Sequence, residues 1–217
     1  MQDVGTRYGA RADARAVSTT TLLGQVMFLV AVALAFTVAG TYIGRDLTDG
    51  TAFILFLAGF GMLLVQGFVE RLRVGTFAIA WLYAIALLIG LGLGPAISYL
   101  VANDPSTVTQ AAGATALITL GMGAGGFALS KDLAGWMRPL SFVILGCVVV
   151  SFVMLVLSGG GNPILSAIIA IVSALLIAVD FNYLRKHGTG DDAVWLATGI
   201  FVSIINIFLS LLNLFSD

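Results

Sequence analysis

Charged side chains are scarce in this 217-residue sequence. Lysine and arginine contribute ten residues and aspartate and glutamate eleven, together 10% of the chain, whereas soluble domains carry about 25%. Hydrophobic residues reach 59%. A soluble fold could not bury so much apolar surface, so lipid is the solvent for most side chains. The formal net charge of −1 provides no basic surface for nucleic acid.

Histidine and cysteine are almost absent. Cys147 is the one cysteine and His187 the one histidine, which excludes an internal disulfide and a zinc site of Cys/His spacing. No serine or cysteine stands with a histidine in a hydrolytic arrangement. We therefore expect no catalytic residue, metal or cofactor, and no enzymatic activity.

Long apolar runs, in contrast, fill the chain. About 20 apolar residues cross a bilayer as a helix, and seven runs come close to that length. Glycine, proline and charge mark the gaps, and Gly94-Pro95 predicts the end of the third helix. The sequence thus predicts an all-α membrane protein with one seven-helix domain over residues 21–217. The predicted helices are 22–44, 51–69, 74–93, 108–129, 140–157, 164–184 and 193–215.

Lysine and arginine lie almost entirely on one side of these helices. Nine fall in the N-terminal segment or after the second, fourth and sixth helices, and only Arg45 falls on the other side. The positive-inside rule then places the N-terminus in the cytoplasm and the C-terminus outside. Residues 1–20 are polar and predict a disordered cytoplasmic tail. The nine are Arg7, Arg11, Arg15, Arg71, Arg73, Lys131, Arg138, Arg185 and Lys186.

Asp180 lies inside the sixth predicted helix, seven residues or about 10 Å before His187 on the cytoplasmic side. Such an acid costs roughly 2.5 to 3.5 kcal/mol on insertion scales. It either meets a cation or donor, or holds a proton, which makes it a functional candidate; the alternative is a structural acid paired with Arg185. Arg71 and Arg73, beside Glu70, are candidate counter-ions, or else a solvated basic cluster.

Polar side chains form stripes on the last two helices. On helix 164–184 they recur every seven positions, within about 40° of one face, and on helix 193–215 they span about 80°. The stripes either form interhelical hydrogen bonds or line a polar path. Glycine pairs 40/44 and 121/125 match the spacing for close helix packing. The stripe residues are Ser166, Ser173 and Asp180, then Ser203, Asn206, Ser210 and Asn213.

Several segments of the sequence fit the patterns of one known family of membrane proteins. FVSIINIFLSLLNLF (201–215) fits the last-helix pattern aromatic-x-(Asp or Ser)-x-x-Asn-x-Phe-x-Ser-Leu-Leu, and VDFNYLRKH (179–187) fits an acid-bearing sixth helix. GPAISYL (94–100), residues 114–134 and ALAF (33–36) fit earlier segments. With these, the chain resembles the Bax inhibitor family of membrane proteins over about residues 18–217. The resemblance implies six helices around a central seventh.

The resemblance also implies two functions. Several members are described as pH-sensitive calcium leak channels, with one sensor aspartate on each of the last two helices; Asp180 matches the first, whereas Ser203 stands at the second position. Serine there is similar to the bacterial YccA branch, whose members bind and modulate the membrane AAA protease FtsH. We therefore expect a bacterial inner-membrane protein that modulates such a protease through its tail. The alternative is a calcium or proton path formed by Asp180, Ser173, Ser203, Asn206 and Ser210.

Overall fold

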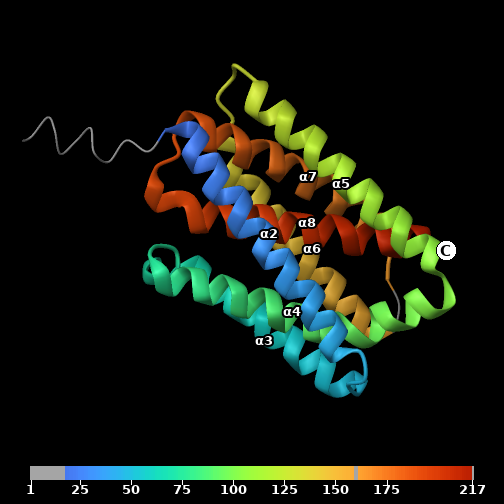
Figure 1. Cartoon of the computed structure of the whole chain (residues 1–217). Helices are drawn as coiled ribbons and strands as arrows, with labels where there is room; N and C mark the ends of the chain where they lie inside the picture. The colour runs from blue at the N-terminus through green and yellow to red at the C-terminus, as the bar shows by residue number, and fades with distance from the viewer. Residues whose placement is uncertain (1–17, 159–160, 217) are drawn as a thin grey trace, which may run out of the picture.

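The computed structural model describes residues 18–158 and 161–216, and this part of the chain contains seven helices long and apolar enough to cross a membrane. The all-α, seven-helix prediction is confirmed (Figure 1). The predicted tail falls mostly on residues 1–17, which lie outside the described residues. The helices are α2 (Thr19–Gly44), α3 (Asp49–Phe68), α4 (Thr76–Asn103), α5 (Pro105–Ala128), α6 (Ala134–Ser158), α7 (Pro163–Lys186) and α8 (Ala193–Phe215), with short 3-10 turns η1 (Glu70–Leu72) and η2 (Gly190–Asp192).

Side-chain caps fix where four of the helices begin. In each case a Ser, Thr, Asp or Asn oxygen accepts the backbone N–H three residues further on, which satisfies one of the free donors at a helix start. Pro105 and Pro163 follow their caps directly, where a missing N–H costs nothing. The capping residues are Ser18, Thr48, Asp104 and Asn162.

The third span does not end at Gly94-Pro95 as predicted, because α4 continues to Asn103. Pro95 has no N–H for the carbonyl of Leu91, four residues earlier. That carbonyl instead faces the backbone of Gly44 on α2, where an added Cβ would lie 2.4 Å from the oxygen. Membrane helices tolerate proline when a neighbouring helix covers the freed group in this way.

Glycine brings α2 and α4 into backbone contact, as predicted for the first pair. A Cβ at Gly40 would lie 2.5 Å from the Leu87 carbonyl oxygen. The prediction for the second pair is wrong, because a Cβ added at Gly121 or Gly125 would have no neighbour within 4 Å among the described residues of other helices. Close packing of α5 on α7 occurs at Gly126, where a Cβ would lie 2.1 Å from the Ala178 carbonyl oxygen. Sequence spacing alone did not identify the glycines that face another helix.

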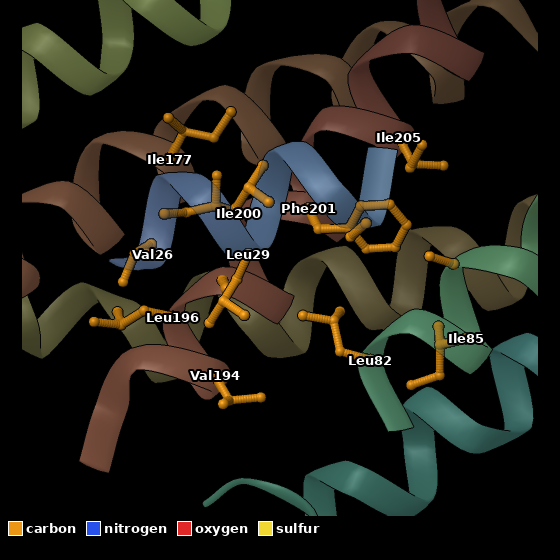
Figure 2. Packing of buried hydrophobic residues seen from close by; sticks show 14 of the residues in the cluster. Val26, Leu29, Leu82, Ile85, Ile177, Val194, Leu196, Ile200, Phe201 and Ile205 are labelled. Atoms are coloured by element: carbon orange, nitrogen blue, oxygen red, sulfur yellow. The ribbon is translucent and has the colours of Figure 1, made fainter. Parts of the chain in front are cut away.

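Helix α8, the seventh span, occupies the centre of the bundle. It packs against α7, α2, α5 and α4, and Ile200, Phe201 and Ile207 are fully buried. Figure 2 shows Ile200 and Phe201 beside Leu29 of α2 and Leu82 of α4. The central seventh helix implied by the family resemblance is therefore present, and it borders every cavity described below.

Candidate functional site

A cavity of about 330 Å³ lies among α3, α6, α7 and α8. Its wall is mostly apolar, from residues such as Phe56, Ile144 and Val202. Six polar side chains interrupt this wall, so the cavity combines a lipid-like lining with a few hydrogen-bonding groups. The polar residues are Gln66, Ser141, Asp180, Thr198, Ser203 and Asn206.

The Asp180 carboxylate is the acid in this cavity. Its side chain is buried, with 6% relative exposure. Gly199 of α8 lies directly opposite, where an added Cβ would be 3.1 Å from Oδ2; the missing side chain leaves room for the carboxylate between α7 and α8. Within residues 18–158 and 161–216, no hydrogen bond or ion pair reaches Asp180. A carboxylate held in this way binds a proton or an incoming cation.

Gln66, near the end of α3, borders the cavity close to Asp180. Its Nε2 donates to the Leu72 carbonyl at 2.9 Å and to Thr198 Oγ1 at 3.2 Å, so it links η1 to α8. Thr198 in turn donates to the Val194 carbonyl at 2.8 Å. The Oε1 atom of Gln66 is buried without a partner in the described structure. An unsatisfied acceptor beside a cavity is available to a water or a bound cation.

The basic cluster after α3 forms no ion pair with Asp180 among the described residues. Arg73 Nε donates to the Gln66 carbonyl at 3.0 Å and its Nη2 donates to the Gly67 carbonyl, which satisfies the free carbonyls at the end of α3. Glu70 and Arg71 are the first two residues of η1. Among the described residues, the ion pairs are Arg45–Asp46 and Asp132–His187, so the predicted pairing of Asp180 with Arg71 or Arg73 is not present.

The amino-acid sequence matches a known family and several known proteins. The family model described as "Inhibitor of apoptosis-promoting Bax1" matches residues 19–217. The chain belongs to the Bax inhibitor family. An uncharacterized protein of Pseudomonas aeruginosa is 28% identical over 95% of this chain and 92% of its own length. An uncharacterized membrane protein of Vibrio cholerae is 26% identical over 92% and 91%, and one of Streptococcus pyogenes is 29% identical over 54% of each chain.

In this Bax inhibitor family member, the cavity brings together part of the predicted stripes. Asp180, Ser203 and Asn206 all line it. Ser173 and Ser210 are buried but do not border it, and the Ser173 hydroxyl has no partner in the described structure. The two stripes therefore share a cavity at the Asp180 end and face packed helices beyond it.

Sequence analysis missed a second polar group at the same end of α7. Asn182, fully buried, donates through Nδ2 to the carbonyls of Gly126, Leu129 and Lys131 at 3.0 to 3.2 Å and accepts the Leu133 N–H at 2.8 Å. One side chain thus fixes the whole α5–α6 connection. The one hint in the sequence is an amide two residues after Asp180, on the opposite face of the helix.

We refer to the hydrogen bonds of Asn182 to the α5–α6 connection as the polar clamp. Charged residues at the end of α7 add further hydrogen bonds to it. Arg185 and Lys186 donate to carbonyls of the α5–α6 connection, and His187 Nε2 lies 2.7 Å from the Asp132 carboxylate. The N–H of Ala134 also donates to Asp132 at 2.9 Å. These hydrogen bonds, first that from Ala134 and then that of His187, hold the pKa of Asp132 below its ordinary value. The predicted start of this helix at residue 140 is wrong, because α6 begins at Ala134, whose N–H donates to Asp132.

Proposed function

We propose that this multi-pass membrane protein is a pH-sensitive cation leak in which Asp180 is the proton-binding residue. One observation carries the proposal: a buried carboxylate, with no ion pair or hydrogen bond in the described part of the chain, faces a cavity between helices. Intramembrane acids are expensive to insert, so an acid without a structural partner supports a role in binding a proton or ion.

The charge state of Asp180 sets what the cavity holds. With a proton bound, the cavity is neutral. Without it, one negative charge at depth is balanced by an entering cation, and Ser203 and Asn206 supply further oxygen ligands of the kind Ca²⁺ takes. Ser173, seven residues before Asp180 on α7, and Ser210, seven residues after Ser203 on α8, are buried outside the cavity, and we propose that the path continues along them toward the opposite end of the bundle.

Flux from proteoliposomes tests this proposal. The full chain, reconstituted with a calcium-sensitive dye, should pass Ca²⁺ at a rate that depends on pH, and Asp180→Asn should abolish that dependence. Asp132→Asn is the matched control, because it removes an acid that lies outside the cavity. A wild-type protein without pH-dependent flux, or an Asp180→Asn variant with an unchanged profile, contradicts the proposal.

The second candidate is modulation of a membrane AAA protease of the FtsH type, with the protein acting as a binding partner in membrane protein quality control. Two observations favour it: Ser203 replaces the second acid of the two-aspartate pattern, and the cavity wall is mainly apolar. The lysine and arginine distribution supports a cytoplasmic N-terminus, on the same side as the ATPase domain of such a protease.

Co-purification tests the second candidate. Deleting residues 2–17 keeps the cap at Ser18 and removes the segment that an ATPase would engage. The proposal expects the protease to co-purify with the full chain, and expects the deletion to reduce both association and turnover. If association and turnover are unchanged by the deletion, the protease candidate is excluded, whereas the flux assay remains an independent test of the first.

A further inference from the structure

A second and larger cavity, about 930 Å³, opens between α2 and α5 on the other side of α8. Helices α2 and α5 form its walls, α4 closes one end, and Ile204, Ile205 and Phe208 of α8 form its floor. In Figure 1, α5 stands apart from α2 and α8 runs between them. We refer to this space as the α2–α5 groove.

The walls of the groove are mainly apolar. Ala31, Ala112 and Ala116 leave it hollow, and the hydroxyls of Thr37 and Thr115 donate to carbonyls of their own helices, at 3.1 Å and 2.7 Å. Those two hydroxyls therefore offer no free donor to a ligand, whereas the Thr119 hydroxyl on the same lining is buried without a partner in the described structure. The volume falls in the range of ligand pockets, roughly 300–1,000 Å³, and the chemistry suits a hydrocarbon chain.

The groove opens to the bilayer and is deep enough for an acyl chain. Val38 and Leu120 on its rim are 69% and 68% exposed, in spans that lipid surrounds. Along α2 the lining extends from Met27 to Arg45, roughly 27 Å at 1.5 Å per residue. One leaflet of hydrocarbon is about 15 Å, half of the roughly 30 Å core, so the groove exceeds the depth of one leaflet.

A single cation stands at the mouth of the groove. Arg45 lies 4.5 Å above the centre of the Tyr42 ring, and its Nε donates to Asp46 at 3.2 Å. It is the one lysine or arginine at this end of the spans. A guanidinium has five N–H donors in a fork that suits phosphate, so most of them remain available beyond the bond to Asp46.

We propose that the α2–α5 groove binds a phospholipid of the surrounding bilayer, with an acyl chain on the α8 floor and the phosphate on Arg45. The site is separate from the Asp180 cavity, because α8 lies between them and Ile205 borders both. The guanidinium donors that the Arg45–Asp46 pair leaves free at the mouth, and the mainly apolar walls below them, point to the same class of molecule.

Native mass spectrometry of the purified full chain in detergent tests the proposal, with palmitoyl-oleoyl phosphatidylglycerol as the probe. The wild type should retain one lipid. Ala116→Phe fills the groove and should abolish retention; Leu120→Trp on the exposed rim does the same if the first variant does not fold. Arg45→Gln should weaken binding about tenfold, the loss expected for one charge-assisted contact.

Three controls make the result decisive. Leu117→Phe, on an exposed α5 position outside the lining, should bind like the wild type, as should Arg138→Gln at the opposite end. Dipalmitoyl glycerol, which lacks the phosphate, should bind as weakly to the wild type as to Arg45→Gln. Retention that is unaffected by filling the groove overturns the site, and equal binding of the phosphate-free lipid overturns the role of Arg45.

Discussion

The two sides of α8 place charge differently. On the α3, α6 and α7 side, a carboxylate lies inside a cavity and a polar clamp joins α7 to the α5–α6 connection. On the α2, α4 and α5 side, glycine contacts and apolar walls dominate, and the charge, Arg45, stays at the mouth. One central helix therefore separates a cavity that contains a buried acid from a groove with mainly apolar walls.

The largest expected effect on stability comes from a substitution at the glycine contacts between α2 and α4. A Cβ at Gly90 would lie 2.2 Å from the Thr37 carbonyl oxygen, so Gly90→Ala forces α2 and α4 apart and should lower the free energy of unfolding by about 2–4 kcal/mol. Unfolding in mixed detergent micelles measures this. Gly121→Ala, at a position with no neighbour within 4 Å, should be neutral or slightly stabilising; equal losses in both variants would show that α2 and α4 do not meet at Gly90.

On the polar side, Asn182→Ala should have the next largest effect. It removes the partner of three buried or half-buried carbonyls and of one N–H, which should cost about 2–3 kcal/mol. Asn206→Ala, in the cavity wall, is the control and should cost far less. Hydrogen exchange of residues 129–133 should rise only in Asn182→Ala, and protection that stays unchanged would mean that the clamp does not hold this connection.

Removing the charge inside the bundle and removing the charge at the mouth of the groove should have different effects on the free energy of unfolding. Asp180→Leu relieves a buried acid without a partner in the described structure and should raise the free energy of unfolding by about 1–3 kcal/mol. Arg45→Leu, half-exposed beside Asp46, should leave it nearly unchanged. The same unfolding assay compares them, and a destabilised Asp180→Leu variant would reveal a structural partner for this acid.

The smallest expected effect is the loss of the exposed Asp132–His187 pair at low pH. The pKa of Asp132 is lowered in the folded protein, so its contribution to stability is present above the ordinary aspartate pKa near ~3.9 and is lost as the pH falls through the lower, folded value. Proteolysis of the α5–α6 connection should therefore increase below about pH 4. Asp132→Asn should show this increased cleavage already at neutral pH, and a wild-type profile in that variant would contradict the role of the pair.

The helical spacing of polar residues predicted some features of the Asp180 cavity and missed others. Spacing by seven placed Asp180 on the face toward α8, because the turn of a helix is fixed. It could not show that Arg73 satisfies the end of α3, that Gly199 leaves room for the carboxylate, or that Gln66 and Thr198 border the cavity. Those facts depend on which helices become neighbours, and no local pattern encodes that.

The sequence by itself determined the seven spans, because apolar length and backbone hydrogen bonding leave a helix as the solution in lipid. It also determined that one acid, Asp180, lies at depth. Only the tertiary structure decided that α4 continues past Pro95, that Gly126 and not Gly121 contacts another helix, and that α8 separates two cavities. The reason is physical: in a bilayer, apolar side chains gain nothing by facing each other over facing lipid, so close packing and polar contacts, formed only in the assembled bundle, select the neighbours.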